Sequence, residues 1–146
     1  MIGLLQRVTE ASVAIDKKIV GHIDQGLMVL VGVEKNDSKT QADRLLERLL
    51  SYRVFPDDEE KMNLSLTDIN GGLLLVPQFT LAADTQKGKR PSFSTAASPD
   101  KGQELFQYLV ERAQANFPDV AMGQFGADMK VSLVNDGPVT FWLEAR

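Results

Sequence analysis

The sequence predicts one α+β domain, residues 1–146, built on a curved, barrel-like and largely antiparallel β-sheet with two main helices. Two segments have helical periodicity preceded by capping residues, and most other apolar segments have the length of strands. The order of these segments is strands, helix, strand, helix, strands, which is typical of α+β folds. A chain of 146 residues is of ordinary size for one domain.

The first part of the chain contains four predicted strands. Residues 1–8, 11–16 and 19–24 form short runs, and Asp16-Lys17-Lys18 is predicted to be a hairpin turn. Residues 26–33 are almost wholly apolar, which predicts a central strand that is buried on both faces.

Two helices are predicted from their caps and spacing. Ser38 and Gln41 form a capping box at the start of the first helix. Ser98 and Pro99 are the N-cap and first residue of the second helix, which ends before Pro118. Their apolar residues recur at helical spacing: Ala42, Leu45, Leu46, Leu49 and Leu50 in the first helix, and Leu105, Phe106, Leu109, Val110 and Ala113 in the second.

The remaining strands are predicted at residues 73–79, 120–125, 129–134 and 139–143. Gly71-Gly72 introduces the first of these strands. We find no internal repeat and no linker between domains, so all of these strands are assigned to the same sheet.

Two predicted loops are longer than a simple connection requires. Residues 56–62 are acidic and typical of a solvated turn. Residues 82–97 contain the three cations Lys87, Lys89 and Arg90 within four positions. Loops that exceed about 12 residues without structure of their own are often functional or disordered.

Composition excludes several classes of protein. A net charge of −4 argues against a broad basic surface that coats nucleic acid, although a local basic patch can still bind one RNA end. The absence of cysteine excludes disulfides, thiolate nucleophiles and thiolate metal sites. The longest apolar run is too short to span a bilayer and the start does not resemble a signal peptide, so we expect a cytoplasmic protein with no membrane partner.

Conventional catalytic machinery is not evident in the sequence. The only histidine is His22, in a predicted strand, and we interpret it as a structural or surface residue. One histidine without cysteine cannot build an ordinary zinc site, and no phosphate-binding or nucleophile motif is present. No metal or cofactor is therefore predicted. An enzyme with this sequence would act through positioning and backbone amides on a bond that is already reactive.

Two segments carry a specific resemblance. Pro77-Gln78-Phe79-Thr80-Leu81 and Asn135-Asp136-Gly137-Pro138-Val139-Thr140 resemble the signature motifs of the D-aminoacyl-tRNA deacylase family, Ser-Gln-Phe-Thr and Asn-x-Gly-Pro-Val-Thr. Further matches follow in order along nearly the whole chain: Gln6-Arg7-Val8-Thr9, Ala11-Ser12-Val13, Gly32-Val33-Glu34, Lys61-Met62-Asn63-Leu64, Arg90-Pro91-Ser92-Phe93 and Ala127-Asp128-Met129.

The resemblance implies chiral proofreading in translation. Its substrate would be a tRNA 3′ end that carries a D-amino acid or glycine, and the ester would be hydrolysed while L-aminoacyl-tRNA is rejected. It also implies a homodimer in which Gly137 and Pro138, joined by a cis peptide bond, present carbonyls in the partner subunit's pocket. Carbonyls fixed there would leave no room for an L side chain. The alternative interpretation of Gly137-Pro138 is a tight turn between strands.

The same resemblance implies the catalytic residues Gln78, Phe79 and Thr80. We favour backbone N–H groups, including that of Phe79, which polarise the ester carbonyl, together with the neighbouring 2′-hydroxyl of the substrate's ribose. Thr80 as a nucleophile is the alternative, although no base is visible to activate it. Pro77 replaces the family's usual serine, which removes an N–H and a hydroxyl and leaves rate or substrate preference open.

Other residues have two interpretations. Arg7 either braces the Gly-Pro element or pairs with a surface carboxylate. Ala127 and Met129 line the pocket, or Met129 is only a core residue. Lys87, Lys89 and Arg90 contact the acceptor end of tRNA or are simply solvated: this basic loop is the best local candidate for such a contact.

Two other functions fit the same residues. The protein could be a binding module that captures a D-amino acid or an RNA 3′ end without turnover. It could also be a broader esterase of small aminoacyl esters, for which tRNA is incidental.

Overall fold

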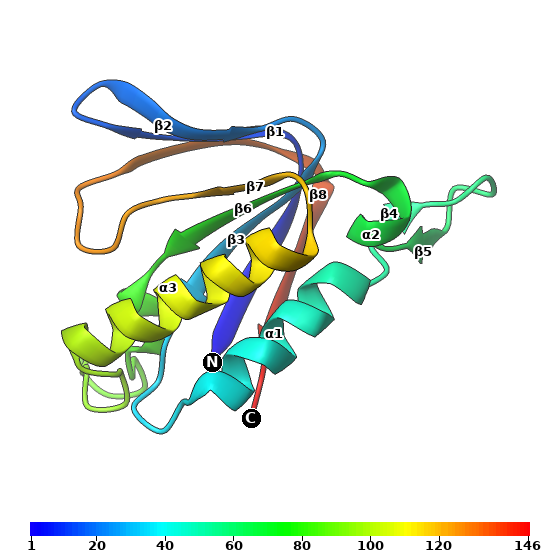
Figure 1. Cartoon of the computed structure of the whole chain (residues 1–146). Coiled ribbons are helices and arrows are strands. Elements are labelled where there is room, and N and C mark those ends of the chain that lie inside the picture. The colour runs from blue at the N-terminus through cyan, green and yellow to red at the C-terminus, as the bar shows by residue number, and fades with distance from the viewer.

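A 14-residue strand, β1, organises the sheet in the computed structural model, which describes residues 1–146 (Figure 1). The α+β prediction is confirmed, and the curved sheet forms a nearly closed barrel. The elements are β1 (Ile2–Ile15), β2 (Lys18–Ile23), β3 (Gly26–Gly32), α1 (Lys39–Ser51), β4 (Phe55–Pro56), β5 (Met62–Leu64), α2 (Leu66–Ile69), β6 (Gly72–Pro77), the 3₁₀ helix η1 (Phe79–Ala82), α3 (Pro99–Asn116), β7 (Val120–Met122) and β8 (Lys130–Glu144).

The six-stranded sheet is mixed rather than wholly antiparallel. Its order is β2-β1-β3-β6-β7, and β8 pairs with the free edge of β1. The pairings of β1 are antiparallel, whereas β3–β6 and β6–β7 are parallel. Parallel neighbours need a long crossover connection. The two main helices lie on these crossovers, α1 between β3 and β6 and α3 between β6 and β7, and together they cover one face of the sheet (Figure 1).

The predicted helix caps are confirmed. The side chain of Ser38 accepts a hydrogen bond at the start of α1, and Gln41 completes the capping box. Ser98 caps α3, with Pro99 as its first residue. Asp16 and Lys17 have φ of 50° and 66°, so the predicted hairpin turn is confirmed as a two-residue connection of β1 and β2.

Several predicted boundaries are wrong, and the strand predicted at residues 120–125 ends at Met122. Residues 1–8 and 11–16 belong to the single strand β1, and residues 129–134 and 139–143 belong to the single strand β8. The tight-turn interpretation of Gly137-Pro138 is therefore wrong as well, because β8 continues past it along β1. Phe79 is the first residue of η1 and not the last residue of a strand. Each of these differences depends on pairing between segments that are distant in the sequence.

Two apolar clusters form the core. The larger one includes Leu5, Leu45, Leu75 and Leu109 and lies where the sheet meets α1 and α3. The smaller one, which includes Met28 and residues of β1, β2, β3 and β6, lies within the curl of the sheet. No helix combines the length and apolar composition that crossing a bilayer requires.

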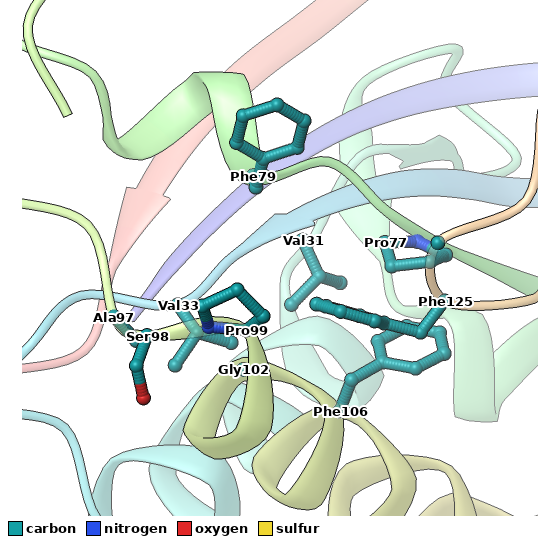
Figure 2. Close-up of a pocket in the computed structure, with 11 residues that line it drawn as sticks. Val31, Val33, Pro77, Phe79, Ala97, Ser98, Pro99, Gly102, Phe106 and Phe125 are labelled. Carbon is teal, nitrogen blue, oxygen red and sulfur yellow. The ribbon is translucent and has the colours of Figure 1, made fainter.

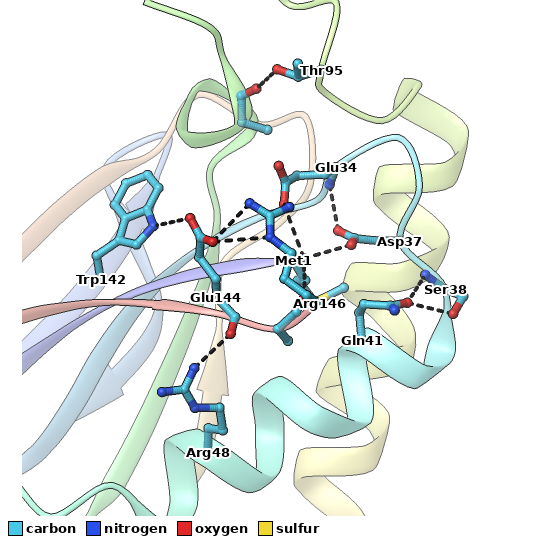
Figure 3. A network of polar contacts seen from close by, with 12 residues as sticks. Met1, Glu34, Asp37, Ser38, Gln41, Arg48, Thr95, Trp142, Glu144 and Arg146 are labelled. Atoms are coloured by element: carbon cyan, nitrogen blue, oxygen red, sulfur yellow. Dashed lines mark hydrogen bonds and ion pairs between the residues drawn. The ribbon is translucent and has the colours of Figure 1, made fainter.

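A polar network ties the two ends of the chain to the start of α1 (Figure 3). The Met1 amino group donates to Asp37 Oδ1 at 2.7 Å and to the Ala145 carbonyl at 2.9 Å. Arg146 pairs with Glu34 at 2.8 Å and with Glu144 at 3.0 Å. Donation from the indole N–H of Trp142, and then from Arg146, holds the pKa of Glu144 below its usual range.

His22 lies on β2, where its side chain is 49% exposed and its Nε2 is 3.7 Å from Asp24 Oδ1. It lines none of the cavities described below that contain Phe79. Its position agrees with the interpretation of a surface residue.

Candidate active site

The candidate catalytic segment lies where β6 passes into η1. The Gln78 N–H donates to the Val31 carbonyl of β3 at 2.8 Å, so the preceding residue faces the β7 side of the strand. On the β7 side, the last backbone hydrogen bond of the strand is the one that Gly123 N donates to the Leu75 carbonyl, also at 2.8 Å. The N–H that Pro77 lacks therefore falls beyond the end of the sheet, where proline is tolerated.

The first residues of η1 leave backbone donors free. The N–H groups of Phe79 and Thr80 have no partner among the turn, loop and cap hydrogen bonds of the chain, as is usual in the first turn of a helix. The Phe79 residue is 59% exposed. Gln78 Nε2 donates to Thr80 Oγ1 at 2.5 Å, so the threonine hydroxyl contacts an amide and not a base.

One cavity beside this segment gathers four of the predicted site residues. We call it the Met129 cavity, and its volume is about 280 Å³. Gln78, Phe79, Ala127 and Met129 all line it. Thr80 does not line it. The lining residues are Val76, Pro77, Gln78, Phe79, Phe125, Gly126, Ala127, Met129 and Val131.

A second cavity lies on the α3 side of the same segment (Figure 2). We call it the Gly102 cavity, and its volume is about 240 Å³. It is mostly apolar, and its walls come from β3, from the start of α3 and from the segment around Phe125. It shares Pro77, Phe79, Phe125 and Gly126 with the Met129 cavity, so Phe79 lies at the boundary of the two.

Glycine at position 102 allows an aromatic ring to lie on α3. A Cβ atom there would be 3.2 Å from Phe125 Cζ, which is tighter than an ordinary contact. Figure 2 shows the rings of Phe125 and Phe106 together at one end of this cavity and Phe79 on the opposite side. The cavity is therefore walled by aromatic rings and small residues.

Arg7 contacts the predicted Gly-Pro segment through a backbone carbonyl. Its Nε donates to the Asp136 carbonyl at 2.9 Å, and its Nη1 donates to the Val54 carbonyl at 2.6 Å. The side chain is only 12% exposed, and its distance to the Asp136 carboxylate is 3.6 Å. Arg7 therefore combines two hydrogen bonds to backbone carbonyls with an ion pair to the Asp136 carboxylate, so it makes contacts of both predicted kinds.

The Gly-Pro segment is a bulge in β8. Gln6 pairs with Thr140 and Val8 with Asn135, so residues 136–139 stand opposite the single residue Arg7. Asn135 closes the bulge, because its Oδ1 accepts from Val139 N at 2.7 Å and its Nδ2 donates to Thr140 Oγ1 at 2.8 Å. These two hydrogen bonds fix the path of the backbone between Asn135 and Thr140.

Gly137 and Pro138 are exposed and line neither cavity of their own chain. The peptide bond between them is cis, as the resemblance implies. The second edge of β8 pairs with no strand. Exposed apolar side chains lie along the same strand: Val134, Phe141 and Trp142.

The basic loop reaches the edge of the site. Lys87, Lys89 and Arg90 are exposed and form no ion pair within the chain. Phe93, on the same loop, has its ring centroid 5.3 Å from that of Phe79. The loop is anchored to η1 by the hydrogen bond from Thr95 Oγ1 to the Ala82 carbonyl, 2.5 Å.

Sequence reasoning missed Phe125, Gly126 and Gly102 as site residues. Gly102 carried a usable signal, because a glycine on the apolar face of a predicted helix indicates a close approach by another group. Phe125 carried none, because it follows a short strand and only the fold brings it to α3. No cluster of three or more metal-ligating side chains is present.

Known proteins resemble this chain in sequence over nearly its whole length. The sequence profile described as D-Tyr-tRNA(Tyr) deacylase matches residues 4–144. A Pseudomonas putida protein named D-aminoacyl-tRNA deacylase is 65% identical over 144 residues, which cover 99% of this chain and 99% of that protein. A protein of the same name from Janthinobacterium sp. is 61% identical over 146 residues, which cover 100% of this chain and 98% of that one.

Two solved structures are similar to this chain over nearly its whole length. The c-Myc DNA Unwinding Element Binding Protein is similar with a TM-score of 0.95 and 32% identity, over 100% of this chain and 99% of that chain. A probable eukaryotic D-amino acid tRNA deacylase is similar with a TM-score of 0.81 at 18% identity, over 98% of both chains, which supports the fold alone. The chain therefore belongs to the D-Tyr-tRNA(Tyr) deacylase family.

Proposed function

We propose that this protein, as one deacylase domain of residues 1–146 in the cytoplasm, hydrolyses the ester of D-aminoacyl-tRNA and of glycyl-tRNA. The observation that carries the proposal is the pair of free N–H groups at Phe79 and Thr80, of which Phe79 lies at the boundary of two cavities. One cavity can hold the aminoacyl group and the other the terminal nucleoside. The names of the relatives from Pseudomonas putida and Janthinobacterium sp. support this substrate class.

In the proposed reaction, backbone N–H groups of the protein stabilise the transition state. The ester carbonyl oxygen accepts hydrogen bonds from Phe79 N and Thr80 N, which stabilise the negative charge that develops when water attacks the carbonyl carbon. Removal of one such donor typically costs about 10²- to 10³-fold in kcat. The C–O bond to the ribose then breaks. The neighbouring 2′-hydroxyl passes a proton to the departing 3′-oxygen and regains one from the attacking water.

Chiral selection comes from a second copy of the chain. The carbonyls of the partner's Gly137 and Pro138 enter the Met129 cavity, accept hydrogen bonds from the substrate ammonium group and occupy the space of an L side chain. Glycine has no side chain to exclude and is accepted. The unpaired edge of β8 and its exposed apolar residues support such a dimer, and Arg7 holds the bulge in place.

Thr80→Ala tests whether the threonine is a nucleophile. We expect kcat to fall by no more than about tenfold, because the variant loses only the hydrogen bond from Gln78, and a neutral bond contributes about 0.5–1.5 kcal/mol. Single-turnover hydrolysis of D-Tyr-tRNA measures this rate. Complete loss of turnover, with unchanged melting temperature and substrate affinity, would show that Thr80 attacks the ester.

Gly102→Leu tests whether the Gly102 cavity holds the terminal adenosine. The new side chain meets Phe125 and fills the cavity. We expect kcat/KM to fall by about 5- to 150-fold, which corresponds to the about 1–3 kcal/mol of base stacking. Gln114→Leu, at an exposed position of the same helix, is the matched control. Equal activity of both variants would place the nucleoside elsewhere.

Combined replacement of Lys87, Lys89 and Arg90 by alanine tests the basic loop. We expect weaker binding of tRNA and a slope of log K against log salt that is shallower by about 2 to 3, the contribution of three phosphate contacts. Fluorescence anisotropy with labelled tRNA at several salt concentrations measures both values. An unchanged slope would mean that the loop is solvated and makes no phosphate contact.

One experiment separates the proposed function from its rivals. D-Tyr-tRNA, L-Tyr-tRNA and Gly-tRNA are incubated with the protein, and released amino acid is measured over time. We expect fast loss of the D-tyrosyl and glycyl esters and persistence of the L-tyrosyl ester. Equal hydrolysis of the D and L esters would favour a broad esterase, and stable binding without release would favour a binding module.

A further inference from the structure

A third cavity adjoins the Gly102 cavity along α3. We call it the Gln107 groove, and its volume is about 350 Å³. It shares the rings of Phe106 and Phe125 with the Gly102 cavity, so the two hollows flank the same pair of aromatic side chains. The lining residues are Val20, Gln103, Phe106, Gln107, Met122, Gly123, Gln124 and Phe125.

The lining of the groove is polar but uncharged. Three glutamines, Gln103, Gln107 and Gln124, line it together with apolar residues that include Met122 and Phe125. No carboxylate lines the groove, although the chain has an excess of acidic residues. The amides of Gln103 and Gln124 have no partner in the chain, and Gln107 Nε2 donates only to Glu111 at 3.2 Å.

Such a lining matches a nucleobase better than a phosphate. Each amide offers one acceptor oxygen and two donor hydrogens, which is the mixture that the edge of a base presents. Proteins that read single-stranded RNA combine hydrogen bonds to these edges with stacking on aromatic side chains. A phosphate would instead require cations, and the groove contains none.

We propose that the Gln107 groove binds the base of the nucleotide that precedes the terminal adenosine, a cytosine in the unpaired 3′ end of every tRNA. This inference rests on the proposed function, which puts the adenosine in the Gly102 cavity and the amino acid in the Met129 cavity. Of the three cavities that contain Phe125, only the groove is then free for the next base. Gln103, Gln107 and Gln124 are thus specificity-determining residues.

Three synthetic esters test this inference without the rest of the tRNA. D-tyrosyl esters of adenosine, of cytidylyl-adenosine and of uridylyl-adenosine are compared by kcat and KM. We expect a lower KM for the cytidylyl ester than for both others, at equal kcat. Alanine at Gln103, Gln107 or Gln124 should shrink this advantage by about 2- to 12-fold each, the range of one neutral hydrogen bond. Gln114→Ala, on an exposed part of α3, should leave it intact.

The outcomes separate this inference from the proposed function. If all three esters are hydrolysed with the same KM, or if the three glutamine variants keep the full advantage of the cytidylyl ester, the groove does not bind the base. Hydrolysis of the adenosine ester in that experiment still supports the deacylase. If neither the esters nor D-Tyr-tRNA are hydrolysed, the proposed function fails and the inference fails with it. The glutamines are exposed, and thermal melting verifies that each variant folds.

Discussion

Gly137→Ala is expected to lower kcat/KM for D-Tyr-tRNA by about 100-fold or more. A Cβ atom at this position would lie 2.6 Å from Val139 Cγ2 and 3.2 Å from Arg7 Nη2. The φ of Gly137 is 138°, a conformation that residues with a side chain rarely adopt. The bulge must therefore shift, and displacement of a substrate-positioning group by about 1 Å can cost about 10²-fold in rate.

Single-turnover hydrolysis and thermal melting of the same preparation measure the effect. The backbone strain alone should cost about 1–3 kcal/mol of stability, which leaves most of the protein folded at assay temperature. Gly88→Ala is the matched control for backbone strain in thermal melting, because Gly88 also has a positive φ, 69°, but has no atom within 4 Å of the added Cβ. A Gly137→Ala enzyme with normal rate and normal D/L selectivity would mean that the bulge has no part in substrate recognition.

Gly26→Ala is expected to have the largest effect on stability, a loss of at least about 3 kcal/mol, the upper part of the range for overpacked cores. The added Cβ would lie 1.9 Å from the Gly72 carbonyl oxygen, and backbone cannot rotate away as a side chain can. Gly26 and Gly72 are the first residues of β3 and β6 and pair with each other. The two strands would have to separate where the parallel part of the sheet begins.

Urea unfolding measures this loss as the change in midpoint at constant slope. Gly3→Ala on β1 is the control, because its nearest neighbour is Leu45 Cδ1 at 3.0 Å, the mobile end of a side chain. We also expect lower activity from any folded Gly26→Ala protein, since β6 leads directly into Gln78. Equal stability of the two variants would show that β3 and β6 can separate at little cost.

Local features of the fold were predictable because their causes lie within a few residues. Ser38 and Ser98 satisfy backbone donors of the turns that they begin, and Asp16-Lys17 reverses the chain through its own backbone conformation. The mixed sheet was not predictable in the same way. Whether β6 pairs in parallel with β3 depends on where α1 crosses the sheet, and periodicity within a segment carries no information on that choice.

The candidate site, too, was predictable from the sequence only in part. The motif around Gln78 and Phe79, and its likeness to a known family, are contained in the sequence. The juxtaposition of this motif with Ala127, Met129 and Phe125 is decided by β6, β7 and α3, which bring distant segments together.

The sequence by itself determined the two main helices, the hairpin turn, the family motifs and the lack of conventional acid–base groups. The tertiary structure decided that Gly137 and Pro138 form a bulge on a continuous strand, held by Arg7 and outside the cavities of their own chain. The physical reason is how far apart in the sequence the interacting residues lie. Caps and turns are fixed by hydrogen bonds between near neighbours, whereas the bulge and the cavities exist only when strands far apart in sequence pair and pack.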